Sequence, residues 1–507
     1  VDSWDVSFNN GDYNVRAWVI KNSSDNSMYD LYIGADSKIV APSISDRMFR
    51  AYTNCISING LEFLDTSKAT SMNYMFMDSD SLTTLDLSYF DTSKVTQMMY
   101  MFSGCKALKN VDLSSFDTTN VTTMTAMFRY CENMTDVTFG NSFKTNKVTD
   151  MSYMFSRCSK LTKIDLSKFD TSSATNMEQM FAHCNSVKEL QLQQFNTNKV
   201  TTMSSMFNDC SSLTKLDLSS FNTNNVTNMS GLFGGCVNLE TITFGKNFET
   251  SKVEDMSSMF SGCAKLSNLN VSEFNTSKVT NMANMFKGCS SITALDISNF
   301  DTSKVTNMHS MFENCGNLKA IHLGEMFDTS KVTDMKYMFS GNSKLTAIIA
   351  RRTISSVDNA IKFSTDTGLN NLYDAILYVP NEESEKLYEK SENYSTIFGH
   401  AEDTADDLYR VRPILELIGE NPVSVSLGKT YNESTDSGVT IAGFDKDNAS
   451  GYTQFGYNYT VTGLPVDTSK EDTKEVVYTL TYTRPGTTTT ISEMKAIRTV
   501  EVVGKNI

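Results

Sequence analysis

A methionine–phenylalanine pair recurs along this chain at intervals of 26 or 27 residues, and this period constrains the fold more than any other feature. The twelve phenylalanines that mark it are Phe49, Phe76, Phe102, Phe128, Phe155, Phe181, Phe207, Phe233, Phe260, Phe286, Phe312 and Phe339. Only Phe233 lacks the methionine, because Leu232 precedes it. A short segment repeated at a fixed period indicates a solenoid, in which each repeat forms one coil that stacks on its neighbours.

One coil shows how a repeat is expected to fold. Residues 85–87, Leu-Asp-Leu, alternate apolar and polar side chains, which predicts a strand. Residues 91–94, Asp-Thr-Ser-Lys, predict a polar turn. Apolar side chains then stand at helical spacing, which predicts one face of a short helix: Met98, Met101, Phe102 and Cys105. Thr96 is placed to cap the start of this helix and Gly104 to end it.

Stacked coils bury the apolar faces that a single coil leaves exposed. The expected fold class is therefore an α/β leucine-rich-repeat solenoid of about twelve coils over residues 49–350, with a parallel sheet on one side and short helices on the other. The repeat reads Leu-x-x-Leu-Asp-Leu-Ser-x-Phe-Asp-Thr-Ser-Lys-Val-Thr-x-Met-x-x-Met-Phe-x-Gly-Cys. It resembles the BspA-like leucine-rich repeats of bacterial surface proteins. That resemblance implies a secreted or wall-attached bacterial protein, often a suspected adhesin.

The flanks of the repeat predict caps. Residues 1–48 contain two strand-like stretches, 15–20 and 29–33, and we expect them to cap the N-terminal end of the solenoid, whose edge would otherwise be open. Residues 351–411 are expected to form the C-terminal cap and connector. Within them, residues 375–379 predict a strand and residues 382–395 a charged helix.

Residues 412–507 lack the repeat and contain short stretches of alternating apolar and polar residues, separated by turn residues. The predicted strands are residues 423–427, 457–461, 476–482 and 499–503. Such spacing predicts an all-β sandwich. The segment resembles the immunoglobulin-like modules of bacterial surface proteins at Pro413–Leu417, at Tyr431 followed by Gly438–Thr440, and at Arg498–Val500. The resemblance implies a spacer module.

Charge and composition exclude several classes of partner. A net charge of −15 argues against binding to nucleic acid phosphates, and the absence of a long apolar run argues against membrane insertion. No leader stands at Val1 and no anchor at Ile507, so we expect a mature or trimmed extracellular chain. The histidines are isolated from one another, and no nucleophile, phosphate-loop or paired-carboxylate motif is present. We therefore expect no catalytic residues, no metal and no cofactor.

Nine cysteines stand three residues after the phenylalanine of their coil. They are Cys105, Cys131, Cys158, Cys184, Cys210, Cys236, Cys263, Cys289 and Cys315. Stacking would bring neighbouring Cα atoms within disulfide range, but stacked side chains point the same way rather than at each other. We expect a ladder of buried free thiols that pack as small apolar groups. Disulfides remain the alternative, and metal binding is disfavoured because no Cys-x-x-Cys spacing occurs.

The polar turn carries a second ladder. Its first position varies among Asp, Asn, Glu and Lys, whereas its second position is threonine in all eleven coils that contain the turn. A side-chain oxygen that closes the turn, followed by a repeated structural hydrogen bond from threonine, explains this pattern better than a ligand groove does.

Specificity has to lie where the coils differ, and two surfaces qualify. The sheet face carries a row of acidic residues: Asp86, Asp112, Asp165, Asp217 and Asp296. Such a row would suit a cationic partner, and the alternative is that it is ordinary solvated strand surface. On the helix side, tyrosine, arginine and histidine gather in neighbouring early coils: Tyr74, Tyr100, Arg129, Tyr130, Tyr153, Arg157 and His183. Tyr and Arg are enriched in the energetic centres of protein interfaces.

Three functions remain. The first is a non-catalytic, adhesin-like recognition protein, a monomeric solenoid that binds a protein or glycan on a host or neighbouring cell. The second is a structural stalk that displays another domain. A hydrolytic enzyme is a remote third, since no constellation of residues supports it.

Overall fold

The computed structural model describes residues 3–5, 15–22, 29–35, 37–357, 360–361, 376–390, 411–413, 415–418, 423–426, 438–441, 444–445, 457–464, 466–467, 469–470, 472–483 and 490–503. The chain divides into two compact units, residues 1–248 and residues 249–507. Within these units it makes about twelve turns of a parallel β-solenoid, as the repeat predicts, with almost no helix.

The first unit begins with an antiparallel sheet whose strand order is β1 (Ser3–Asp5), β2 (Arg16–Lys21) and β3 (Tyr29–Gly34). β2 and β3 match the two strands predicted there. Parallel pairing of coils starts at β4 (Ile39–Val40), which lies beside β5 (Leu64–Asp65). The assignment of residues 1–48 as a cap stays a prediction.

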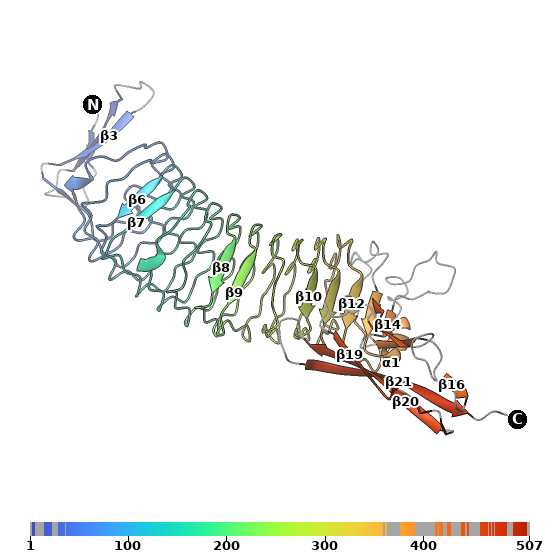
Figure 1. Ribbon diagram of the computed structural model, residues 1–507. Coiled ribbons are helices and arrows are strands. Elements are labelled where there is room, and N and C mark those ends of the chain that lie inside the picture. The colour runs from blue at the N-terminus through green and yellow to red at the C-terminus, as the bar shows by residue number, and fades with distance from the viewer. Residues whose placement is uncertain are drawn as a thin grey trace. The chain divides into compact units, whose positions relative to one another are not determined.

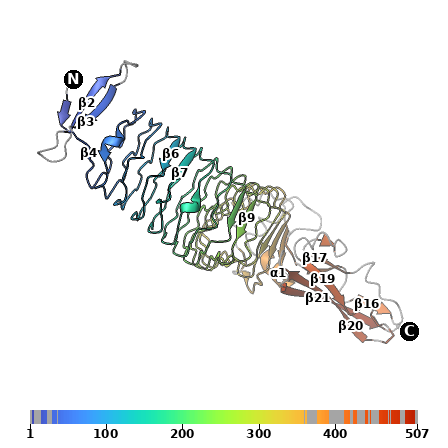
Figure 2. The same cartoon turned by 60° about the vertical axis from the view of Figure 1, so that its left-hand side comes forward.

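One side of each coil, the strand side, carries short parallel strands. In the first unit β6 (Asn110–Leu113) pairs with β7 (Asp136–Phe139), and β8 (Lys215–Leu218) pairs with β9 (Thr241–Phe244) (Figures 1 and 2). In β6 exposed and buried residues alternate, as a strand with one face on the core requires. The predicted sheet is therefore interrupted rather than continuous in this unit.

Between the strand pairs the backbone is irregular. Two single turns of 3-10 helix occur on this side, η1 (Leu61–Phe63) and η2 (Leu166–Lys168). Residues 85–87, predicted as a strand, are not in a regular strand, and a single bridge joins the neighbouring pair Ser57 and Thr84.

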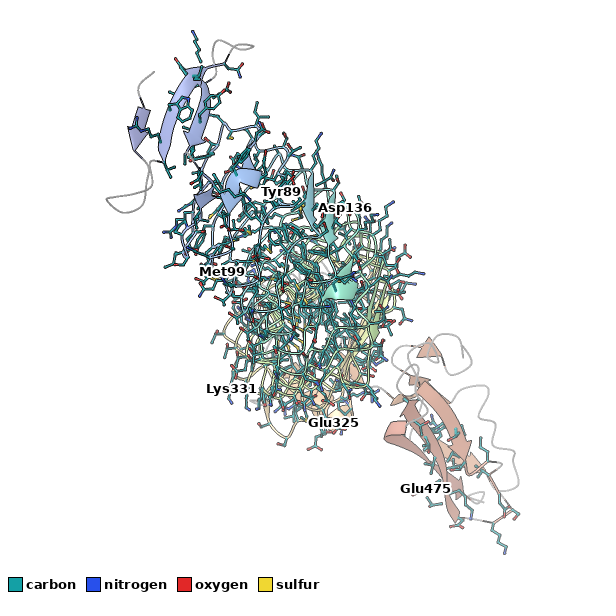
Figure 3. All side chains as sticks on the ribbon, turned by 90° about the vertical axis from the view of Figure 1, so that its left-hand side faces the viewer. Tyr89, Met99, Asp136, Glu325, Lys331 and Glu475 are labelled. Carbon is teal, nitrogen blue, oxygen red and sulfur yellow. The ribbon has the colours of Figure 1, made fainter. Side chains whose placement is uncertain are left out.

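The segment predicted as a short helix is not one, and this corrects the expected α/β class. Its alternate N–H groups bond to the next coil: Met98 to the Thr123 carbonyl (3.2 Å), Tyr100 to that of Thr125 (2.9 Å) and Phe102 to that of Met127 (2.9 Å). Thr96 does not cap a helix, because its hydroxyl bonds to the Thr70 carbonyl of the preceding coil. We call this the turn side. In Figure 3, Met99 on the turn side lies at the opposite edge of the first unit from Asp136, which begins β7.

The other N–H groups of the turn side close tight turns within the coil. Ser103 bonds to the Tyr100 carbonyl and Cys105 to the Phe102 carbonyl, each at 3.1 Å. Positive φ angles at Tyr100 (55°) and Gly104 (78°) break any helix. The continuous ladder of parallel bridges therefore runs along the turn side, as the following bridged residues of the first unit show: Ile44, Ser71, Gln97, Thr123, Asp150, Asn176, Thr202 and Asn228.

The core follows the repeat. Met98, Met101, Phe102 and Cys105 are fully buried. The repeat phenylalanines stack face to face along the first unit, for example Phe76 on Phe102 with ring centroids 5.6 Å apart and planes 3° from parallel. Each such aromatic pair contributes about 0.5–1.5 kcal/mol beyond its buried area.

Some coils have 27 residues, and a glycine takes up the extra length. Between the last strand residue and the next buried phenylalanine, the 26-residue coil of Leu113 has two residues and the 27-residue coil of Phe139 has three, beginning with Gly140. A Cβ at Gly140 would overlap the carbonyl oxygen of Ser114 in the preceding coil. Gly245 makes the same close approach to Ser219. Only glycine fits where the two backbones come this close.

In the second unit the strand side forms a five-stranded parallel sheet. Its strands in order are β10 (Ala294–Ile297), β11 (Ala320–Leu323), β12 (Ala347–Ala350), β13 (Ile376–Val379) and β14 (Val411–Pro413) (Figure 1). The sheet thus continues beyond residue 350, where the sequence period stops.

The predicted strand near residue 375 is β13. The predicted helix is α1 (Glu382–Glu389), whose N–H group at Ser384 bonds to the Asn381 side chain at 2.8 Å. The part of that prediction beyond Lys390 lies outside the described residues.

The rest of the second unit contains two further sheets. One has the order β15 (Leu415–Ile418), β17 (Gly438–Ile441) and β18 (Phe444–Asp445). The other has the order β16 (Val423–Ser426), β21 (Thr490–Val503), β20 (Asp472–Thr483) and β19 (Tyr457–Thr462). The predicted strands 457–461, 476–482 and 499–503 lie within β19, β20 and β21, and the predicted strand 423–427 coincides with β16 as far as Ser426, because residue 427 lies outside the described residues. Tyr431 lies outside the described residues. In the described part of the chain, no helix has the length and apolar character needed to cross a membrane.

Candidate binding surface

Each coil of the turn side contains two residues with positive φ, and these form two columns along the first unit. The first column is Arg47, Tyr74, Tyr100, Ala126, Tyr153, Gln179, Ser205 and Gly231. The second column is Ala51, Asp78, Gly104, Tyr130, Arg157, His183, Asp209 and Gly235. This backbone region costs about 1–2 kcal/mol for residues other than glycine. Six of the seven residues predicted for this surface, all but Arg129, occupy the columns.

The first column carries a tyrosine stack. The Tyr74 and Tyr100 rings lie 5.2 Å apart at 13°, and the guanidinium of Arg47 lies 5.1 Å from the centre of the Tyr74 ring. Both tyrosines are partly exposed. The structure therefore brings these two predicted residues together and adds Arg47, which stands at the same coil position and was not singled out from the sequence.

Arg129 lies close to two aromatic rings. Its guanidinium carbon is 4.8 Å from the centre of the Tyr130 ring and 4.8 Å from that of the Tyr153 ring. The guanidinium of Arg157 lies 5.3 Å from the Tyr130 ring. We call Arg129, Tyr130, Tyr153 and Arg157 the Tyr/Arg cluster. Its members come from two adjacent coils, so the structure unites residues that the sequence separates.

Tyr153 is also held by its hydroxyl. The Tyr153 hydroxyl donates to Glu178 Oε1 at 2.6 Å, and Gln179 Nε2 donates to the Tyr153 oxygen at 3.4 Å. Burial and the hydrogen bond to the Glu178 carboxylate raise the pKa of Tyr153 to about 12. The hydroxyl therefore stays protonated at neutral pH and fixes the ring under Arg129.

His183 continues the second column beyond Arg157. Its Nδ1 lies 3.2 Å from Asp209 Oδ2. Burial, and then the positive charge of Arg157, lower the pKa of His183, while Asp209 opposes the shift. His183 therefore borders the cluster as a half-buried, mostly neutral side chain at pH 7.

The sheet-face aspartates stabilise local turns. One carboxylate oxygen of each accepts the backbone N–H two residues later, at 2.8–3.0 Å; they are Asp86, Asp112, Asp165, Asp217 and Asp296. Hydrogen bonds from Ser88 lower the pKa of Asp86, and those from Ser167 and Ser219 do the same for Asp165 and Asp217. This row closes turns, and Asp296 belongs to the other unit, so the five aspartates do not form one demonstrated site.

The nine repeat cysteines are buried and none of them forms a disulfide. Eight donate to the carbonyl of the phenylalanine in the preceding coil at 3.0–3.2 Å: Cys105, Cys131, Cys158, Cys184, Cys210, Cys236, Cys289 and Cys315. Ser79 and Asn342 stand at the same coil position and donate to the corresponding carbonyls of Phe49 and Phe312. The position therefore holds a hydrogen-bond donor as well as a small side chain. Burial raises the pKa of the Cys184 thiol to about 12.

The threonine ladder bonds adjacent coils. Thr171 Oγ1 donates to the Asn196 carbonyl at 3.0 Å and accepts the Asn196 N–H at 2.8 Å. The equivalent donation is made by Thr66, Thr92, Thr118, Thr145, Thr197, Thr250, Thr276 and Thr302. The turn is closed by the predicted side-chain oxygen, as when Asp91 accepts the Ser93 N–H at 3.0 Å. These contacts belong to the fold and not to a ligand site.

Sequence reasoning missed Glu178, Gln179 and Asp209, which orient Tyr153 and His183 from the next coil. The only signal that could have found them is their position one repeat away from those residues. Among the described residues, no group of three or more His, Cys, Asp or Glu side chains is arranged to hold a metal ion.

Within each unit, coils of about 26 residues bond to one another along a parallel ladder, and this defines the chain as a parallel β-solenoid repeat protein. The family model described as "Mycoplasma protein of unknown function, DUF285" matches residues 45–163, 136–244, 238–350 and 295–375. These matches span more than half of the chain, and the protein belongs to this family of Mycoplasma and BspA-like repeat proteins. No curated protein matches the chain.

Proposed function

We propose that this protein is a non-catalytic, adhesin-like recognition module, secreted by a bacterium or displayed on its surface. It binds a protein or glycan partner through the turn side of the first unit. A solenoid scaffold fits a binding or a structural role. The observation that carries the binding role is the Tyr/Arg cluster, in which three large side chains, Tyr130, Tyr153 and Arg157, stand at backbone positions that favour glycine.

The energetics of those positions support the proposal. Tyr130 (φ 62°) and Arg157 (φ 64°) stand where Gly104 and Gly235 stand in sibling coils. The backbone cost is about 1–2 kcal/mol for each side chain. An exposed cation–π contact returns about 0.5–1 kcal/mol, so the two contacts of Tyr130 only balance its cost. Stability alone therefore gives no reason for these side chains, and strained backbone of this kind is typical of functional sites.

The test removes the cluster without disturbing the coil. The variant Tyr130→Gly with Arg157→Gly uses the residue that sibling coils already carry, so we expect its folding to be preserved. The matched control is Tyr337→Gly, since Tyr337 has φ 58° and is 51% exposed in a coil of the other unit. Both variants and the wild type are tested on a glycan array and against extracellular-matrix and serum proteins. We expect at least tenfold weaker binding for the double variant and no change for the control. Equal binding by all three chains would rule out the cluster as the binding site.

The second candidate is a stalk that displays another domain. It is favoured by the ladders of Met, Phe, Cys and Thr, which serve stacking in every coil. A stalk predicts that no protein or glycan in the panel binds, and that no face of the solenoid is protected from surface labelling. A reproducible footprint over the Tyr/Arg cluster would exclude it.

For residues 412–507 we propose an immunoglobulin-like sandwich that acts as a spacer. Support comes from the contact between β15 of one sheet and β21 of the other, and from an apolar interior formed by Val476, Tyr478, Leu480 and Val500. Limited proteolysis of the full chain is expected to release a stable fragment that begins near Leu415. Progressive degradation of this segment would contradict the proposal.

A further inference from the structure

Several cations of the turn side are neutralised by an acid of an adjacent coil: Arg50 by Asp78 (3.7 Å), His183, when protonated, by Asp209 (3.2 Å), and Lys287 by Glu313 (2.8 Å). Three arginines of the turn side have no such ion pair among the described residues: Arg47, Arg129 and Arg157. Lys287 follows the repeat phenylalanine directly, as Arg129 does. Arg129 has Ser156 at the corresponding place in the next coil, where Lys287 has Glu313.

Arg129 and Arg157 make no ion pair with any carboxylate in the described part of the chain. They are also the only arginines between residues 51 and 350, where every other strong cation is lysine. The Nε atom of Arg129 is buried and has no hydrogen-bond partner. Two unneutralised arginines are thus held beside one tyrosine in a protein whose net charge is −15.

The guanidinium groups of the cluster are suited to a carboxylate. The guanidinium carbon of Arg129 lies 4.8 Å from the centre of each ring, and the donors of a guanidinium group lie in its plane, where they can pair bidentately with a carboxylate. Arg157 is exposed. Its charge reaches its surroundings, because it is one of the causes that lower the pKa of His183.

The size of the surface indicates the kind of partner. From Arg47 to His183 the aromatic and cationic residues cover six consecutive coils of the first unit. At a spacing of about 4.8 Å per coil, five steps give about 24 Å. A standard protein interface covers about 800 Å² per partner, which corresponds to a similar width. A polyanion would be repelled by the acidic chain, whereas a protein with a few exposed carboxylates would not.

Building on the proposed function, we propose that the partner is a protein and that its anchor is one or two Asp or Glu carboxylates bound by Arg129 and Arg157. Tyr74, Tyr100, Tyr130 and Tyr153 supply the apolar contact area around these charges. Planar guanidinium groups, rather than ammonium groups, are needed for this pairing.

The test uses a random peptide display library selected on the full chain, with a glycan array that includes sialylated and sulfated glycans as the competing probe. We expect the selected peptides to be enriched in Asp and Glu, and changing those residues to Asn and Gln to weaken binding at least tenfold. The double variant Arg129→Ser with Arg157→Gly carries residues that sibling coils use, and its affinity for the acidic peptides should be at least tenfold lower. Lys287→Ser removes a neutralised cation from the same coil position and should change nothing.

Three outcomes separate this inference from the proposed function. The carboxylate anchor would be overturned if the selected peptides lacked acidic residues. It would also be overturned if the double variant Arg129→Lys with Arg157→Lys bound as tightly as the wild type. In either case the proposed binding surface would still stand. Binding of sialylated or sulfated glycans alone would overturn the protein partner in the same way. If no peptide, glycan or protein binds the wild type, the proposed function itself fails. A thermal melt of each variant shows that loss of binding is not loss of folding.

Discussion

The threonine ladder offers the sharpest test of how the coils are held together. Thr171 is buried, and its hydroxyl makes two hydrogen bonds to the backbone of Asn196 in the next coil. The variant Thr171→Val keeps the shape of the side chain and removes both bonds. The variant Thr171→Ser keeps both bonds and removes one methyl group.

The two variants are expected to lose different amounts of unfolding free energy. Leaving a buried backbone N–H or C=O without its partner costs about 1–3 kcal/mol. Asn196 is exposed, so we take the lower part of that range for each of its two backbone groups, the N–H and the C=O. The expected loss of unfolding free energy for Thr171→Val is then about 2–3 kcal/mol. Losing one buried methyl group costs about 1 kcal/mol, which is the expectation for Thr171→Ser.

The assay is urea unfolding of the full chain followed by circular dichroism. Thr175→Val serves as the control, since Thr175 lies in the same coil, is exposed and makes one hydrogen bond, to the Thr149 carbonyl at 3.1 Å. We expect the unfolding free energy to fall in the order Thr175→Val, Thr171→Ser, Thr171→Val, with the last variant least stable. If Thr171→Val is as stable as Thr171→Ser, the hydroxyl does not hold the coils together and the reasoning is refuted.

Three further predictions concern stability. Cys184→Ser should lose about 1 kcal/mol less than Cys184→Ala in urea unfolding, because only serine can still donate to the Phe155 carbonyl; the reverse order would make the thiol a purely apolar group. Gly140→Ala should give little folded protein in expression and melting tests, since its Cβ would meet a backbone oxygen of the preceding coil, and a normal melting curve would contradict this. Burial lowers the pKa of His322 from 6.5 to about 4, despite the opposing charge of Asp296. The unfolded chain therefore takes up its proton first, so stability is full above pH 6.5 and falls as the pH is lowered toward 4. The variant His322→Thr should flatten that dependence in unfolding curves measured from pH 7 to pH 4, and an equally steep curve would count against it.

The repeat predicted the solenoid because the residues of each ladder recur at the same position in almost every coil. Phe102 and Cys105 recur at one period and are buried, and Thr92 recurs in the polar turn and bonds to the Asp117 carbonyl. A residue type that never changes while its neighbours vary points to a contact that every coil makes. For this reason the core and the inter-coil bonds could be read from the sequence.

The predicted helix failed for a physical reason. Buried side chains at i, i+3, i+4 and i+7 are compatible with a helix, but a run of tight turns also places Met98, Met101, Phe102 and Cys105 on one face. Gly104, which was expected to end the helix, instead has a positive φ within the run of turns, and the second such residue, Tyr100, carries no sequence signal for it. The hydrogen bonds that decide between the two structures go to another coil, so no local pattern reveals them.

For the candidate binding surface, the sequence showed which side chains share a coil position but not which of them are in contact. Shared coil positions identified the tyrosines and arginines. The contacts of Arg129 with the rings of Tyr130 and Tyr153 depend on how the side chains are oriented between adjacent coils, and so does the hydrogen bond of Tyr153 to Glu178. In the case of the sheet-face aspartates, the composition suggested a ligand surface, whereas the local N–H groups already use one oxygen of each.

The buried thiols of the repeat have a consequence for the lifetime of the molecule. In the oxidising surroundings that we propose for it, nine cysteines stay reduced only while the coils remain closed, because both burial and a high pKa withhold the thiolate. One full unfolding event would expose all nine to random pairing, and many of the resulting disulfides would be incompatible with refolding. The working life of such a protein is therefore set by its rate of unfolding rather than by its equilibrium stability.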